Sequence, residues 1–120
     1  MKIILKGAPR TTNTLYATAC RGSFPTRFMS KLGKELKESY RWQAKSQFKQ
    51  PILRGNLEVE AKIYLGSKRK ADIDNFNKIL YDSLTGIIWE DDSQIIKATT
   101  WKLYSKEDPR IELDILSVDT

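Results

Sequence analysis

The sequence predicts a small α+β domain in which a mixed or antiparallel sheet carries its helices on one face. Residues 57–65 alternate between apolar and polar side chains, which is typical of a half-buried strand. A segment with helical periodicity lies on each side of it, and two further strand-like segments follow near the C-terminus. The expected order is β-α-β-α-β-β, and 120 residues fit one domain over 1–120.

The first strand and the first helix are predicted from the N-terminal half. Ile3–Leu5 is a short apolar segment, and residues 14–27 show no clear pattern. From Phe28 to Phe48 apolar side chains recur every four residues, which predicts a helix with one apolar stripe. Ser30 is a candidate N-cap if the helix starts later.

The second half predicts one helix and two more strands. The helix is expected from Asp74 to Leu84, with Asp74 as its N-cap and Gly86 as the residue that ends it. Strands are expected at 94–104 and 110–116, joined by a hairpin loop at 106–109.

The composition excludes several classes of protein. No histidine is present, so Ser-His-Asp and Cys-His catalysis and imidazole zinc sites are excluded. Cys20 is the single cysteine, so the chain has no internal disulfide and no CxxC metal site. No apolar run approaches the ~20 residues of a membrane helix, and the N-terminal apolar stretch is too short for a signal peptide. We therefore expect a cytoplasmic protein without a membrane partner.

The charge is divided unevenly along the chain. Residues 1–55 carry twelve Lys and Arg against two acids, a balance of +10, whereas residues 56–120 carry nine against thirteen, a balance of −4. The sum is the net charge of +6. A basic first half favours a polyanion partner, because Lys and Arg displace counterions from phosphates. The alternative is a solvated lysine-rich helix face.

The acidic residues of the second half are clustered. Asp72 and Asp74 stand two apart at a predicted strand-to-helix junction, so their carboxylates can point to the same side. Lys78 follows Asp74 by four residues and shares its helical face. Asp91 and Asp92 lie in a turn that the fold can bring alongside. Taken singly, Asp74 is more often a helix cap, and Asp91 with Asp92 a turn.

Carboxylates that converge without His or Cys form a hard-ligand site, which suits Mg²⁺ with Mn²⁺ as a substitute. A cation would also relieve the repulsion between the carboxylates. The basic run Lys68-Arg69-Lys70 next to Asp72 is suited to phosphate. Together these groups predict metal-assisted phosphodiester hydrolysis, in which the lysine neutralises charge on the transition-state phosphate.

Three segments in order carry a resemblance to a known family. They are Lys70-Ala71-Asp72-Ile73-Asp74-Asn75-Phe76-Asn77-Lys78, then Asp82-Ser83-Leu84-Thr85-Gly86, then Asp91-Asp92-Ser93-Gln94-Ile95. The pattern D-x-D-N-x-x-K, D-x-L, D-D-x-Q-[VI] resembles the RusA family of Holliday-junction resolvases. Each part is weak alone, but the combination at this spacing is specific.

The resemblance implies a small α+β homodimer that cuts four-way DNA junctions symmetrically with Mg²⁺ in recombination and repair. It implies that Asp72, Asp74 and Asp92 are acidic site residues, with Asp91 as a neighbouring ligand and Lys78 as the catalytic lysine. Asn75 is expected to give a supporting hydrogen bond. The residues expected to contact DNA are basic: Lys68, Arg69, Lys70, Arg10 and Lys102.

Two departures and two alternatives accompany this interpretation. Ala71 replaces a proline frequent in the family, and the loop at 8–13 matches the family's Pro-Pro-Ser-x-Asn only in part. Two alternative functions stay open. One is a non-catalytic DNA-binding accessory protein, for instance of phage or prophage origin, and the other is a hydrolase of RNA or nucleotides. The large aromatics are expected to pack in the core rather than stack on bases: Trp42, Phe76, Trp89 and Trp101.

Overall fold

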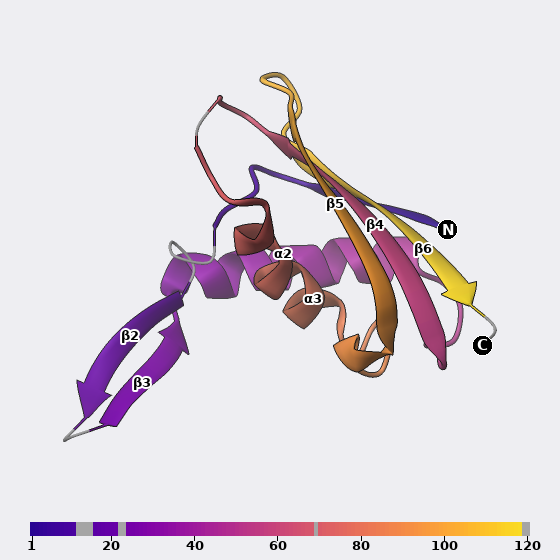
Figure 1. Ribbon diagram of the computed structural model, residues 1–120, viewed down its shortest axis with the longest axis horizontal. Coiled ribbons are helices and arrows are strands. Elements are labelled where there is room, and N and C mark those ends of the chain that lie inside the picture. Colours follow the sequence, from indigo (N-terminus) through magenta and orange to yellow (C-terminus); the bar gives the residue numbers. More distant parts are fainter. Residues whose placement is uncertain (12–15, 22–23, 69, 119–120) are drawn as a thin grey trace.

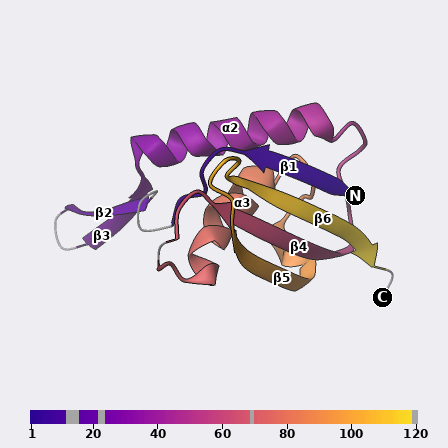
Figure 2. The same ribbon diagram turned by 90° about the horizontal axis from the view of Figure 1, so that it is seen from above.

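The computed structural model describes residues 1–11, 16–21, 24–68 and 70–118, and it places side chains in these ranges except at 16–28 and at Asp74. The main sheet has four strands: β1 (Lys2–Lys6), β4 (Asn56–Leu65), β5 (Ile95–Tyr104) and β6 (Arg110–Val118). Two α-helices, α2 (Lys31–Gln47) and α3 (Asn77–Leu84), lie on the same side of this sheet (Figure 2). The predicted α+β class is confirmed.

Alternation along the strands explains why one face of the sheet is covered. In β4 every second side chain is buried, and the residues between them are partly exposed. The buried ones are Leu57, Val59, Ala61, Ile63 and Leu65. Their neighbours across the sheet, from β1 and β6, are buried on the same face. The helices contribute the other half of the core, whose members include Tyr40, Ala44, Phe76, Leu80 and Leu84.

The strand order is β1-β6-β4-β5, with β4 parallel to β5 and antiparallel to β6. The predicted hairpin between the last two strands is therefore wrong. β4 lies between β5 and β6, and the connection after Tyr104 crosses its end, where the Ser105 amide donates to the Leu65 carbonyl at 2.8 Å. A short loop between two alternating strands has the same sequence signature in both arrangements, so the pattern alone did not separate them.

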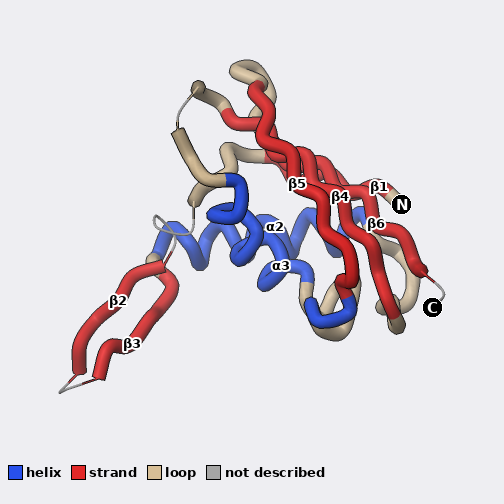
Figure 3. Tube along the Cα trace, viewed as in Figure 1, coloured by secondary structure: helices blue, strands red, loops and turns tan. Residues whose placement is uncertain are grey.

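A second, two-stranded sheet accounts for the segment without a clear sequence pattern. β2 (Tyr16–Arg21) and β3 (Phe24–Met29) form an antiparallel ladder, from Tyr16 opposite Met29 to Arg21 opposite Phe24. The hairpin projects away from the main sheet at the N-terminal end of α2 (Figures 1 and 3). The predicted order holds for the main sheet and its two helices, with these two strands added before α2.

The long helix begins where its cap predicts. Ser30 Oγ accepts a hydrogen bond from the Gly33 amide at 3.1 Å, so α2 starts at Lys31. Of its apolar stripe, Tyr40 and Ala44 are buried and Leu36 packs against the core, whereas Leu32 is 38% exposed. The apolar stripe therefore contacts the sheet only beyond the first turn.

The side chains of α2 also occupy the outer edge of β1. Gln47 accepts from the Ile4 amide at 2.8 Å and donates to its carbonyl at 2.6 Å. Gln43 does the same for Lys6, at 2.6 and 3.1 Å. The backbone groups that an edge strand leaves open are thus satisfied by two glutamines one turn apart, which protects this edge from pairing with another chain.

The second helix starts later than predicted. A 3₁₀ turn, η1 (Ile73–Phe76), precedes α3, whose N-cap position is Phe76 and carries no side-chain capping bond. Asp74 is therefore not the N-cap of α3, because the tighter turn places it within η1. The predicted C-terminal end is confirmed: Gly86 follows the last turn with a φ of 88°, a conformation that glycine adopts without a steric penalty.

The four large aromatic side chains divide into two pairs. Phe76 and Trp89 are buried as expected, and Trp89 donates to Thr85 Oγ1 at 3.1 Å. Trp42 and Trp101 are 70% and 49% exposed, so the expectation that they pack in the core is wrong. Trp42 lies on α2 away from the sheet, and Trp101 lies on the sheet face without helices, where it donates to Glu60 Oε2 at 3.0 Å.

Within the described part of the chain, every helix is too short or too polar to span a membrane.

Candidate functional site

The acidic turn before β5 is a closely tied structure. Asp91 is the N-cap of the short 3₁₀ helix η2 (Asp92–Gln94), and its carboxylate accepts from the Ser93 amide at 3.2 Å. Gln94 closes the turn, because its Oε1 accepts from the amides of Glu90 and Asp91 at 2.8 and 2.9 Å. Both acidic side chains of the turn are exposed to solvent.

The same glutamine connects the turn to the strand that follows α2. Its Nε2 donates to the carbonyl of Leu53 at 3.1 Å and to that of Gly55 at 2.9 Å. The oxygen of the side-chain amide therefore binds the turn, and its nitrogen binds the segment that leads into β4. The position of Asp91 and Asp92 relative to the sheet depends on this bridge.

The turn lies near the exposed side of α3. The groups around Asp92 shift the pKa of its carboxyl. That pKa is raised, first because the carboxyl shares a hydrogen bond with Asp91, and further by partial burial and by the negative charges of Asp91 and Asp82. Lys78 acts in the opposite direction, since its ammonium stabilises the carboxylate. Asp91 shows the converse: its pKa is lowered, chiefly by the Ser93 amide.

Lys78 and Asp82 are themselves paired. Their Nζ and Oδ2 atoms are 3.4 Å apart, one helical turn along α3. Tyr81, between them in sequence, packs edge-on against Trp89, and its pKa is raised by burial and by the charge of Asp92. Lys78 and Asp82 thus form an ion pair on α3, and the charges of both act on the Asp92 carboxyl. Asp82 is part of the sequence motif, and its spacing of four residues from Lys78 is the signal that identifies it as the partner of that lysine.

Asp72 and Asp74 lie before the N-terminal end of α3, whereas the acidic turn follows its C-terminal end in the chain. Asp72 is exposed and its carbonyl accepts from the Asn75 amide at 3.1 Å, which forms η1. Lys102 Nζ donates to the Ala71 carbonyl at 2.9 Å and fixes the preceding residue to β5. The side chain of Asp74 lies outside the described residues. Within the described part, no three acidic side chains lie close enough to form a metal site, and no recorded interaction links Asp72 to Asp92.

The residues nonetheless fit a hard cation at the acidic turn. Asp91 and Asp92 are adjacent and share a hydrogen bond, and Asp92 is also exposed to the negative charge of Asp82. All of these donors are carboxylate oxygens, the ligands that Mg²⁺ and Mn²⁺ take, and a divalent ion would relieve their mutual repulsion. The pair supplies part of a coordination shell, and Asp72 and Asp74 are the remaining candidates from the motif.

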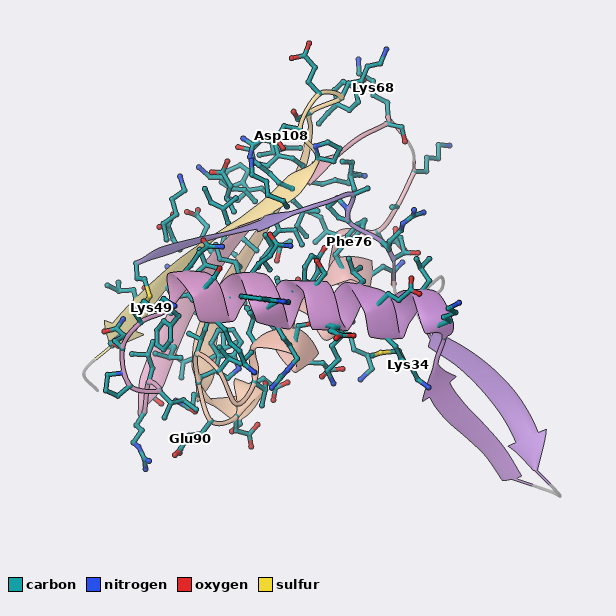
Figure 4. The ribbon with its side chains drawn as sticks, turned by 180° about the vertical axis from the view of Figure 1, so that it is seen from behind. Lys34, Lys49, Lys68, Phe76, Glu90 and Asp108 are labelled. Carbon is teal, nitrogen blue, oxygen red and sulfur yellow. The ribbon has the colours of Figure 1, made fainter. Side chains whose placement is uncertain are left out.

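The basic residues expected to contact DNA are spread over several elements of the structure. Lys68 lies at the far end of the molecule from Glu90 and the acidic turn (Figure 4), 5.6 Å from the centre of the Tyr104 ring. Lys70 and Arg10 are exposed, and Arg69 lies outside the described residues. Lys102 is exposed on β5 in addition to its bond to Ala71.

Comparison with known proteins decides the family. A family model described as endodeoxyribonuclease RusA matches residues 6–116, nearly the whole chain. The chain belongs to the RusA family. This match covers both acidic segments, α2, α3, β4 and β5, so the resemblance carried by the three motifs is confirmed. The family is one of endodeoxyribonucleases, which supports nuclease activity on DNA.

One curated relative shares part of the RusA-family chain. It is the uncharacterized protein YqaN of Bacillus subtilis (strain 168), 43% identical over 49 residues. The shared segment is 41% of this chain and 34% of that protein. The chain therefore matches about a third of the length of this relative, whose printed name gives no activity.

Proposed function

We propose that this RusA-family protein is a divalent-metal-dependent endodeoxyribonuclease that resolves four-way DNA junctions in recombination and repair. The observation that carries the proposal is the Lys78–Asp82 ion pair on α3, 3.4 Å between Nζ and Oδ2, whose charges both act on the pKa of Asp92 in the acidic turn. This arrangement puts an ammonium next to carboxylates at a solvent-facing site, where a phosphodiester has access to both.

Asp91 and Asp92 would hold Mg²⁺, or Mn²⁺ in its place, together with Asp72 and Asp74 of the D-x-D motif. When bound, such an ion supplies a Lewis acid for the phosphoryl oxygen and lowers the pKa of a bound water. The roles of Asp72 and Asp74 rest on the family motif, whereas those of Asp92 and Lys78 rest on the motif and on their proximity.

Lys78 has the role of neutralising charge on the phosphate during cleavage. Its ammonium is paired with Asp82 at 3.4 Å, so its position is restricted before DNA arrives. A cation held in place stabilises developing negative charge more than a freely rotating one, because it needs no reorganisation as the reaction proceeds. Asp82 is thereby proposed as a positioning residue for Lys78.

A four-way junction has two equivalent strands related by a two-fold axis. Two copies of the site in a homodimer would match this symmetry and cut both strands at equivalent positions. We therefore propose a homodimer as the active form, working on DNA in the cytoplasm.

The test is cleavage of a labelled four-way junction by the full chain. We expect paired nicks on opposite strands with Mg²⁺ and no product with EDTA. Competition by unlabelled linear duplex or RNA should leave the junction products unchanged at equal concentration. Binding without any metal-dependent product would instead support the non-catalytic accessory protein, and preferential loss of RNA would support an RNA hydrolase.

A further inference from the structure

The outer side of α2 carries an exposed surface that the proposed cleavage site does not use. Trp42 is 70% exposed there, the largest exposed fraction recorded for a large apolar side chain among the described residues. Beside it is a hollow of about 710 Å³ whose lining includes Met29, Lys34, Lys37, Arg41 and Lys45. The acidic turn and the exposed residues of α3 do not contribute to this lining.

The charge of this surface is strongly positive. Four cationic side chains line the hollow against a single acid, Glu38. No ion pair is recorded for Lys34, Lys37 or Lys45 among the described residues, whereas Lys78 and Arg54 each have an acidic partner. An array of lysines on one helix flank without neutralising partners attracts a polyanion.

The helix holds these lysines in a fixed line. Lys34 and Lys45 are eleven residues apart, which corresponds to roughly 16 Å along the axis of an α-helix. Arg41 Nη1 donates to the carbonyls of Ser83 and Thr85 at 3.1 and 3.0 Å, so this flank of α2 is anchored to the end of α3. The lysines therefore face the partner as a preformed row.

We propose that Lys34, Lys37, Lys45 and Trp42, here called the α2 basic face, bind the sugar–phosphate backbone of a DNA arm outside the cleavage site. The lysines would contact successive phosphates, and the flat indole would pack against the sugar edge. DNA fits better than an acidic protein because the cations form a line along the helix axis, which matches the regular spacing of backbone phosphates, beside an exposed aromatic ring. The inference rests on the proposed function for the identity of the polyanion.

Binding is measured without cleavage, by fluorescence anisotropy of a labelled four-way junction in EDTA at several salt concentrations. The test variant is Lys34→Ala/Lys37→Ala/Lys45→Ala in the full chain. The matched control, Lys49→Ala/Lys97→Ala/Lys106→Ala, removes the same charge from residues outside the hollow. Lys49 follows the C-terminal end of α2, far from Lys34 (Figure 4), whereas Lys97 lies on β5 and Lys106 in the loop before β6.

We expect the test variant to bind about tenfold or more weakly near 0.1 M salt, and its log–log salt slope to be smaller by about 3, since each lost phosphate contact removes about 0.9. The control should stay within about threefold of wild type. Trp42→Ala should weaken binding several-fold, whereas Trp101→Ala, at the other exposed tryptophan, should not. Circular dichroism and thermal melts of each variant separate loss of binding from loss of folding.

Equal losses in the two triple variants would overturn the proposal, because net charge rather than this face would then set affinity. Unchanged junction affinity in the test variant would also overturn it, and loss of poly-L-glutamate binding in that case would assign the face to an acidic protein. Failure of the wild type to cut a junction in Mg²⁺ would refute the cleavage function alone, since the binding measurement contains no metal.

Discussion

Gln94 holds Asp91 in place through its side chain: Oε1 accepts from the Asp91 amide at 2.9 Å while Nε2 donates to the carbonyls of Leu53 and Gly55. The last polar residue of the D-D-x-Q motif therefore has a structural reason for its spacing. It is three residues after Asp91 because the capping box of a short 3₁₀ helix requires an acceptor at that position.

Replacing Gln94 by alanine should displace the acidic turn. We expect a loss of about 1–3 kcal/mol in the free energy of unfolding, because the Leu53 and Gly55 carbonyls lose a donor. Junction cleavage should fall more than tenfold while junction affinity changes little. Gln94→Glu keeps the acceptor and loses the donor, so its activity should be intermediate. Urea unfolding and single-turnover cleavage measure the two effects, and a Gln94→Ala protein with wild-type rates would refute the positioning role.

Lys78→Met removes the ammonium but keeps an unbranched side chain. Loss of a group that stabilises transition-state charge typically costs 10²–10³ in rate, so cleavage should slow by about a hundredfold. Affinity for the junction in EDTA should stay within about threefold. A defect confined to affinity, with an unchanged rate at saturation, would contradict the transition-state role.

Asp82→Asn tests the positioning of that lysine. We expect cleavage to slow by a smaller factor than for Lys78→Met, and the Lys78→Met/Asp82→Asn double variant to be no slower than Lys78→Met alone. Additive losses would show that Asp82 acts independently of Lys78. Single-turnover rates for the four proteins of this cycle supply the comparison.

Tyr40→Phe should stabilise the protein. The Tyr40 side chain, on the core-facing side of α2, is buried, and its hydroxyl has no hydrogen-bond partner among the described residues. Burial also raises the pKa of this phenol, since the charged form is excluded from the core. Removing an unpaired buried hydroxyl is expected to gain about 1 kcal/mol, or a few degrees in Tm. A clear loss of stability in a thermal melt would show that the hydroxyl does have a partner.

Glu112→Gln should change the acid side of the stability curve. The Glu112 carboxylate lies 3.1 Å from Lys2 and 2.7 Å from Arg110, and these two cations lower its pKa. A carboxyl with a lowered folded-state pKa stabilises the protein above its unfolded pKa, and this contribution disappears as pH falls through the folded value. Wild type should therefore exceed Glu112→Gln in stability by about 1 kcal/mol at pH 7. Urea melts between pH 2 and 7 should show this difference shrink once the pH falls below the unfolded value of about 4.3 and disappear below the lowered folded value; a difference that stays constant from pH 7 to pH 2 would contradict the linkage.

Local sequence patterns predicted the elements whose signals are local. The alternation at 57–65, the Ser30 cap and the Gly86 terminus each report one element's own backbone, and the structure confirms all three. The strand order was not accessible in this way. Whether β4 lies between β5 and β6 depends on long-range pairing, and a five-residue connection at 105–109 is compatible with a hairpin as well as with a crossing.

In the candidate site, too, local sequence signals were predictive and long-range contacts were not. The motif spacing pointed to Lys78, Asp91 and Asp92, and the charges of Lys78 and Asp91 both act on the pKa of Asp92 in the folded protein. It did not identify the bridge made by Gln94, because its partners Leu53 and Gly55 contribute only backbone carbonyls and carry no side-chain signal. The exposure of Trp42 was also not predictable, since an indole at a helical position fits a core stripe equally well until the packing is known.

Cleavage of a 5′-labelled four-way junction in Mg²⁺ by Asp92→Asn, compared with Asp114→Asn on an exposed position of β6, tests the central claim most directly. The account predicts that Asp114→Asn cuts at the wild-type rate, and that Asp92→Asn binds the junction but leaves it intact. Paired nicks produced by Asp92→Asn at the wild-type rate would contradict it.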